Sequence, residues 1–153
     1  MDEITGLKGV FAMVFTALTA WLGILSVPIY ILVILCMVDY FTGMFAAPAR
    51  GERINSNKGF TGIAKKVCVL LLVGLGAAID WLVIHTITHY GLEWHIDFLV
   101  ATFVAVWLIS NELISILENM VDMGVKIPPF LMPLVAKIKG TVENQANNMG
   151  GDK

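Results

Sequence analysis

Long, nearly uncharged apolar runs constrain this chain more than any other feature of its sequence. The 153 residues are 58% hydrophobic and only 14% charged, and the charges concentrate in a few short segments. A run of about 18 or more apolar residues is typical of a membrane-spanning helix. In lipid, a helix satisfies its own backbone hydrogen bonds, which an isolated strand or loop does not. The sequence therefore predicts an all-α integral membrane protein.

The apolar runs divide into four predicted spans, at about residues 7–25, 28–47, 63–84 and 96–116. The first stretch is too long for one helix, because about 20 residues suffice to cross the bilayer. Pro28 lies near its middle, and a proline removes a helical hydrogen bond. We therefore expect the first two spans to form a tight hairpin. The alternative is a single kinked and tilted helix, which gives three spans in total.

Basic residues are distributed unequally between the predicted loops. The 48–66 segment carries five of them, the 85–95 loop has no Lys or Arg, and four lysines follow the last span. The positive-inside rule places the 48–66 segment and the C-terminus in the cytoplasm. The N-terminus is then inside with four spans and outside with three. Because Lys8 is the only base before the first run and no clear cleavage site follows, we expect this run to be retained rather than removed as a signal peptide.

The C-terminal segment 127–153 differs in character from the predicted transmembrane domain, 1–126. Toward the end of that domain, polar side chains fall on one arc at helical spacing: Asn111, Ser115, Glu118, Asn119 and Asp122. The last span is therefore expected to run on past the membrane surface. After Pro128 and Pro129, an amphipathic helix is predicted over 131–142, at the lipid interface. We expect residues 143–153 to be a loose tail.

Three carboxylates lie inside the apolar runs, where a charge costs about 3 kcal/mol: Asp39, Asp80 and Glu112. Asp39 is about 10 Å from the inner end of its predicted span, and Glu112 is closer still to the inner surface. Because Lys65 and Lys66 enter the membrane from that side, a cluster of both carboxylates with one lysine is geometrically possible. Such groups would hold a helix bundle closed, or later line an aqueous path. The simpler interpretation is helix capping or a position at the headgroups, which we favour for Asp80 and Glu112.

Other candidate sites carry less information. Gly74 and Ala78 form a small-xxx-small pattern, which suits close helix packing within or between subunits. Cys36 and Cys68 both lie in apolar runs, where a thiol packs as a small hydrophobe. His85 and His89 have the spacing of a helical metal site, but at a membrane surface we expect them to bind no metal. With no nucleophile and base arranged for catalysis, no cofactor motif and a net charge of −2, neither an enzyme nor a nucleic-acid-binding protein is expected.

Three short motifs follow one another at Met37–Gly43 (MVDYFTG), Asn55–Lys66 (NSNKGFTGIAKK) and Asn111–Asn119 (NELISILEN). In content, order and spacing they resemble the phage holin family that includes the clostridial toxin-secretion and lysis holins, over about residues 25–130. Members of that family are often drawn with three spans. The positions that match the family motifs are Asp39, Tyr40, Thr42, Gly43, Asn55, Ser56, Lys58, Gly59, Gly62, Lys65, Lys66, Asn111, Glu112, Ser115, Glu118 and Asn119.

The resemblance implies a homo-oligomer of the bacterial cytoplasmic membrane that forms lesions in the bilayer during cell lysis. Its functional partner would be a murein hydrolase (an endolysin), released through the lesion without direct contact, and related proteins serve in toxin secretion. Asp39, Asp80, Asn111 and Glu112 are then our candidates for pore lining or assembly. Two other functions fit the same residues: a small oligomeric ion channel, and a membrane scaffold that recruits a soluble partner through 111–142.

Overall fold

The computed structural model of the protein describes residues 3–52, 56–92 and 98–150. Within these residues every regular element is helical, as the sequence predicts. The helices are α1 (Glu3–Leu22), the 3₁₀ turn η1 (Gly23–Leu25), α2 (Ser26–Ala46), α3 (Ser56–His89), α4 (Leu99–Asp122) and α5 (Leu131–Gly150).

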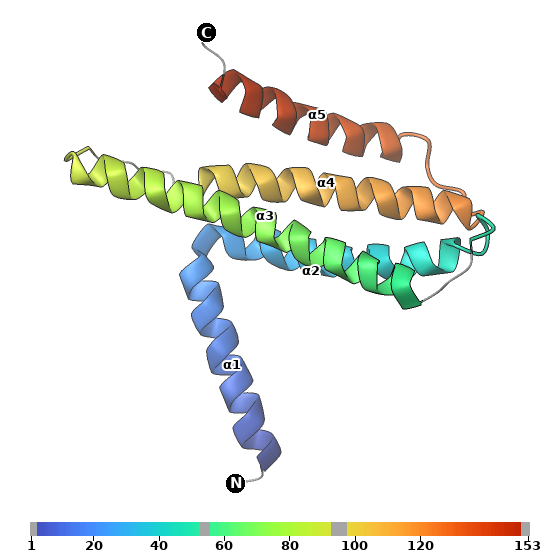
Figure 1. Ribbon diagram of the computed structural model, residues 1–153, viewed down its shortest axis with the longest axis horizontal. Helices are drawn as coiled ribbons and strands as arrows, with labels where there is room; N and C mark the ends of the chain where they lie inside the picture. Colours follow the sequence, from blue (N-terminus) through green and yellow to red (C-terminus); the bar gives the residue numbers. More distant parts are fainter. Residues whose placement is uncertain (1–2, 53–55, 93–97, 151–153) are drawn as a thin grey trace.

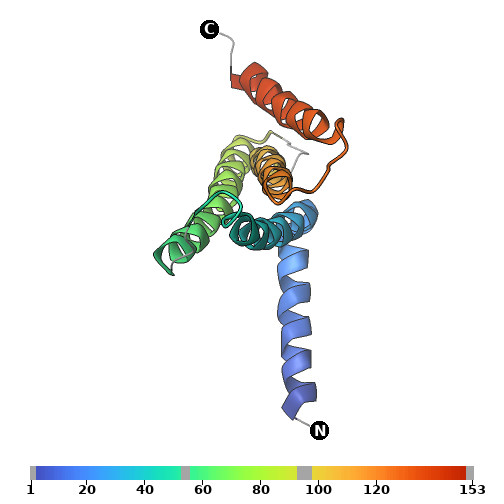
Figure 2. The same cartoon turned by 90° about the vertical axis from the view of Figure 1, so that its right-hand side faces the viewer.

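Helices α2, α3 and α4 form a bundle in which α4 packs against both of the others (Figures 1 and 2). The core between them contains Leu25, Leu32, Cys36, Val73, Ala101, Ala105 and Leu108. Cys36 is thus the packing residue that the sequence predicts, whereas Cys68 is exposed on α3, and both thiols are free. Small side chains on α4 let the helices approach closely, which is common where helices associate in lipid.

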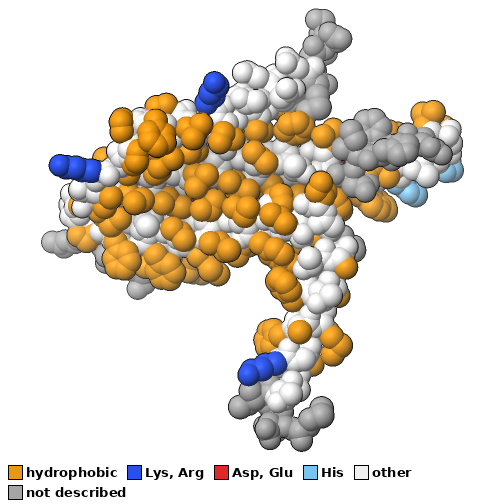
Figure 3. All heavy atoms as spheres, turned by 180° about the vertical axis from the view of Figure 1, so that it is seen from behind, with side chains coloured by type: hydrophobic (Ala, Val, Ile, Leu, Met, Phe, Trp, Pro, Cys, Tyr) orange, Lys and Arg blue, Asp and Glu red, His pale blue; other side chains and the backbone are white. Residues whose placement is uncertain are grey.

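The outside of this bundle is largely apolar. Side chains such as Ile34, Leu71 and Leu75 are about 60% exposed (59%, 61% and 62%), and apolar atoms cover much of the face in Figure 3. Soluble monomers rarely expose so large a continuous apolar surface. Among the described residues, three segments are long and apolar enough to cross a bilayer, at Gly23–Ala46, Gly59–His89 and Leu99–Asp122. The last three predicted spans therefore correspond to α2, α3 and α4.

The N-terminal helix does not form the hairpin that the sequence suggested. Figures 1 and 2 show α1 pointing away from the bundle instead of returning along α2, and its apolar segment, Thr5–Ala17, is shorter than the three candidate spans. Pro28 lies in the first turn of α2, where its missing N–H breaks no helical hydrogen bond. The direction changes at Gly23, whose positive φ of 51° favours glycine. A stacked contact between Phe15 and Tyr30, and a 2.5 Å hydrogen bond between the hydroxyls of Thr19 and Tyr30, hold this junction.

The C-terminal helix is longer than predicted. It begins at Leu131, as expected, but continues to Gly150, so residues 143–150 are helical and not a loose tail. This helix runs back alongside α4 (Figure 1), and its Glu143 accepts a hydrogen bond from Trp107 of α4. On its predicted apolar face Val135 is buried, whereas Leu134 and Ile138 are 50% and 44% exposed.

Candidate functional site

Three charged side chains, one from each helix of the bundle, meet in its interior. Lys66 Nζ of α3 lies 2.6 Å from Asp39 Oδ2 of α2 and donates a hydrogen bond to Glu112 Oε2 of α4. The side chains of Asp39, Lys66 and Glu112 are only 12%, 23% and 7% exposed. We refer to these three residues as the ionic cluster. Lys66 is therefore the lysine that completes the arrangement anticipated from the sequence, while Lys65 is exposed.

The ionic cluster ties the three helices together because none of its charges is stable alone at that depth. A buried charge without a partner is strongly destabilising, whereas attraction to a well-placed partner offsets much of the cost of removing the charge from water. Lys66 supplies one positive charge to two carboxylates, so the cluster has a formal charge of −1 when all three groups are ionised. Glu112 does not cap a helix, since its carboxylate is buried against Lys66.

Asn119 extends the cluster toward the end of the bundle. Its Nδ2 donates to Asp39 Oδ1 at 3.1 Å and to Thr42 Oγ1 at 3.2 Å. The side chain lies against Gly43, where an added Cβ would be 3.6 Å from Asn119 Nδ2. The predicted polar arc of α4 therefore faces partly into the helix bundle and partly outward. Asn119 faces α2 and is buried, while Glu118 is exposed.

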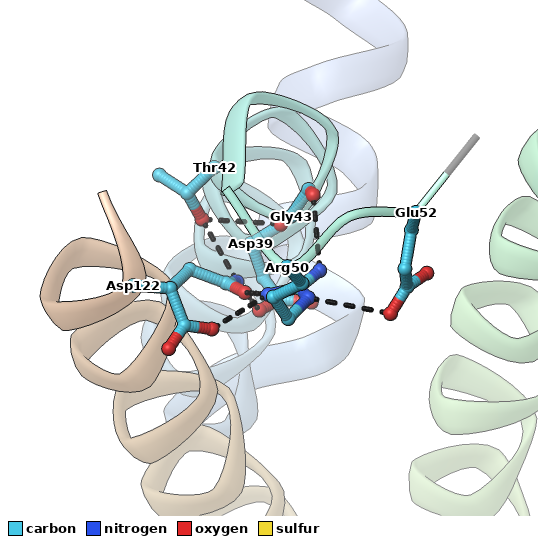
Figure 4. Close-up of polar contacts among 7 residues, drawn as sticks. Asp39, Thr42, Gly43, Arg50, Glu52 and Asp122 are labelled. Atoms are coloured by element: carbon cyan, nitrogen blue, oxygen red, sulfur yellow. Dashed lines mark hydrogen bonds and ion pairs between the residues drawn. The ribbon is translucent and has the colours of Figure 1, made fainter. Parts of the chain in front are cut away.

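Arg50, in the turn after α2, closes this end of the bundle (Figure 4). Its guanidinium donates to Asn119 Oδ1 at 3.0 Å, to Asp122 Oδ2 at 2.9 Å and to the Gly43 carbonyl at 3.3 Å. Arg50 Nε also lies 3.4 Å from Glu52 Oε1. The hydrogen bond to Asp122 raises the pKa of Arg50 above its ordinary value, which stabilises the charged form. The sequence places Arg50 only in a basic loop, and its contact with α4 depends on the turn geometry.

Tyr40 occupies the contact between α2 and the start of α3. A Cβ added to Gly59 would lie 3.2 Å from the Tyr40 hydroxyl, and one added to Gly62 would lie 3.4 Å from Tyr40 Cε2. The two glycines, one helical turn apart, leave room for the aromatic ring. Three of the motif positions therefore have a packing explanation: a ring on one helix and the flat surface that receives it on the next.

At the opposite end of the bundle, Asp80 caps α4 from α3. Its carboxylate accepts hydrogen bonds from the backbone N–H of Val100 at 2.9 Å and of Ala101 at 2.8 Å. These N–H groups belong to the first turn of α4 and have no partner within the helix. The capping interpretation of Asp80 is therefore the one that the geometry supports. Nearby Gly76 lies so close to α4 that an added Cβ would be 2.9 Å from Ala101 Cα.

The other predicted residues do not join a common site. Gly74 and Ala78 face outward, so the small-xxx-small pair does not pack helices within the subunit, and Gly76 does so instead. Asn111 and Ser115 are half-buried on α4. His85 stacks on Trp81, with ring centroids 5.3 Å apart, and the described part of the chain holds no group of metal-ligating side chains. Asn55 lies outside the described residues, as do the side chains of Ser56 and Lys58.

Comparison with known proteins gives a family and no structural precedent. The bacteriophage holin family matches residues 16–140. An uncharacterised protein of Listeria innocua is 35% identical, over 86% of this chain and 81% of the relative. An uncharacterised protein of Halalkalibacterium halodurans is 34% identical, over 88% of this chain and 94% of the relative. An uncharacterised protein of Clostridium perfringens is 31% identical, over 86% of this chain and 87% of the relative. No solved structure matches this chain.

Proposed function

This chain belongs to the bacteriophage holin family, and we propose that it self-assembles in the bacterial cytoplasmic membrane into lesions that release large cargo. The cargo is a murein hydrolase, or another folded protein, that accumulates in the cytoplasm and needs no direct contact with the chain. Two features of the structure support this function: the ionic cluster and the apolar exterior of the bundle.

The observation that carries the proposal is the pairing of Lys66 with Asp39 and Glu112 inside a bundle whose exterior is apolar. A protein that accumulates in the bilayer before it acts must be stable there as a single subunit. Charges satisfied inside the bundle meet that need, because no charge from the cluster has to face lipid. The same groups can exchange their partners for water once subunits assemble around an aqueous opening. The cluster thus holds the subunit closed and is available to respond to assembly.

We propose a topology of three spans, α2, α3 and α4, with Arg50 and the ionic cluster toward the cytoplasm. The support is the basic 48–66 segment, which joins α2 to α3 at the end of the bundle where Arg50 lies. In the resting subunit the C-terminus is then cytoplasmic. A fourth span would require α1 to turn about Gly23 and cross the bilayer beside the bundle. We place α1 outside the three-span bundle, with the N-terminus on the outer side.

Induced expression in a bacterium tests the function. The host cytoplasm would contain a murein hydrolase that lacks an export signal, and membrane potential and culture density would be followed together. We expect an abrupt loss of both, and loss of potential alone when the hydrolase is omitted. Loss of potential with steady density in the presence of the hydrolase would show a small channel instead. No change in either quantity would favour a scaffold and contradict the proposal.

A further inference from the structure

Helix α5 carries charged and polar side chains, yet it packs beside the part of α4 that crosses the middle of the bilayer. It runs back along α4, and its Glu143 Oε1 accepts a 2.7 Å hydrogen bond from Trp107 Nε1. Trp107 is eight residues from the outer end of α4 and fifteen from Asp122, which corresponds to about 12 Å and about 22 Å along the helix. Both distances place Trp107 well inside a hydrocarbon core of about 30 Å. The docked α5 therefore carries charged groups to the interior of the bilayer.

Two charged side chains of α5 contact Trp107: Glu143 binds the indole N–H, and Lys139 lies over the ring. Lys139 Nζ lies 5.2 Å from the centroid of the indole ring, one turn of α5 before Glu143. The side of α5 away from α4 is largely polar, with exposed side chains at Lys137, Thr141, Asn144, Gln145 and Asn148. In contrast to α2, α3 and α4, this helix is not among the segments apolar enough to span a membrane. Its outer face would be costly in contact with lipid and favourable in contact with water.

The packing beneath α5 is also incomplete. A groove of about 690 Å³ remains between it and the α3–α4 surface, and the groove walls include Leu75, Ile79, Val104, Val142 and Asn147. Close-packed permanent interfaces leave few voids larger than a water molecule. Among the α5 side chains that the structure describes, Val135 is the buried apolar anchor, at 5% exposure. A helix held by one buried anchor and a polar contact over a groove is suited to reversible docking.

We propose that the docked position of α5 is the one it takes in the assembling lesion, where its polar face lines the aqueous lumen, and that docking comes before the ionic cluster, still paired in this structure, exchanges its partners for water. In the resting subunit α5 lies away from α4 at the inner surface, and Trp107 is in contact with lipid. This inference rests on the proposed function, because without an aqueous lumen nothing would cover the outer face of the docked helix. It also implies that residues 143–150 move from the inner side toward the outer side as the lesion forms.

Fluorescence of Trp107 in lipid vesicles tests the inference. A chain with Trp21, Trp81 and Trp94 replaced by Phe would be placed in vesicles that contain acyl-brominated lipid and an encapsulated dye. The protein-to-lipid ratio is then raised. Below the density at which dye escapes, we expect strong quenching of Trp107 by the brominated chains. Above it most of this quenching is lost, because α5 covers the ring. Quenching that is the same on both sides of the threshold would overturn the inference.

Two further chains identify what covers Trp107. Lys139→Ala with Glu143→Ala removes the polar contact and should leave Trp107 quenched at every density. Lys137→Ala with Asn144→Ala alters only the outer face of α5 and should lose quenching as the parent does. Loss of quenching in the Lys139→Ala, Glu143→Ala chain would overturn the inference, because another surface must then cover the ring. Absence of dye release at all densities would contradict the proposed function itself, and the inference with it.

Discussion

Lys66 Nζ on α3 lies 2.6 Å from Asp39 Oδ2 on α2, and the same ammonium donates to Glu112 on α4. One positive charge thus joins three helices that otherwise meet through apolar side chains. The arrangement makes the bundle most sensitive to Lys66, because its removal leaves both carboxylates buried without a cation. Removal of one carboxylate leaves Lys66 paired with the other.

Replacement of Lys66 by Met should strongly destabilise the subunit. It leaves the carboxylates of Asp39 and Glu112 buried together without a cation, and breaking a buried pair in this way costs about 3–5 kcal/mol. Lys65→Met is the matched control, since Lys65 is exposed and one residue away. Denaturant unfolding of both variants in mild detergent measures the difference. Equal stability of the two variants would show that the ionic cluster does not hold the bundle together.

Asp39→Asn should bring lysis forward. The amide keeps the size of the side chain, but it has one oxygen where the carboxylate serves Asn119 with one oxygen and Lys66 with the other. The ion pair with Lys66 or the hydrogen bond from Asn119 is therefore lost, at a cost of about 1–3 kcal/mol. A bundle that opens more easily reaches the lesion state at lower protein density. Culture density after induction measures the onset, with protein level checked by immunoblot and Glu118→Gln on exposed α4 surface as control. Unchanged timing at equal protein level would remove Asp39 from the mechanism.

Gly76→Ala should weaken the contact between α3 and α4. The new methyl group would lie 2.9 Å from Ala101 Cα, so the backbone must move, and overpacking of this kind costs about 1–3 kcal/mol. Gly74→Ala is the control two residues away, where nothing lies within 4 Å of the added Cβ. It should be neutral or slightly stabilising, because Ala favours helix more than Gly. An equal loss of stability in Gly76→Ala and Gly74→Ala would argue against the close contact between α3 and α4 at Gly76.

Asp80→Ala should release the first turn of α4. The N–H groups of Val100 and Ala101 lose their acceptors, and loss of a cap costs about 0.5–2 kcal/mol. Amide hydrogen exchange reads this locally: both amides should exchange faster, while those near Glu112 stay protected. Asp80→Asn retains one acceptor oxygen, so its exchange rates at these amides should lie between those of the parent chain and Asp80→Ala. Unchanged protection at residues 100 and 101 would mean that the carboxylate does not cap α4.

The predictable part of this fold is the part that depends on position along a helix. Apolar run length locates α2, α3 and α4, and depth from the inner surface brings Asp39, Glu112 and a lysine to one level. Which lysine joins them depends on the rotation of α3 about its axis, and an apolar helix with lipid around it has little amphipathic signal to fix that rotation. Hence Lys66 could not be separated from Lys65.

Other features depend on tertiary geometry that leaves no local pattern. Gly74 and Gly76 are equally small, and only the crossing point of α3 and α4 selects Gly76. Asp80 caps a helix about twenty residues away, beyond the reach of local capping rules. The direction of α1 is set by the αL conformation of Gly23 and by contacts at Tyr30. A proline near the middle of a long apolar run suggests a hairpin, yet here it merely begins a helix.

Release of cargo from vesicles tests the central claim most directly. Purified protein would be added at rising density to vesicles that hold a small dye and a folded fluorescent protein, and the escape of each would be followed in the same sample. A holin lesion of the proposed kind releases both together above a threshold density. Escape of the dye with full retention of the folded protein, at every density, would contradict it and leave a channel.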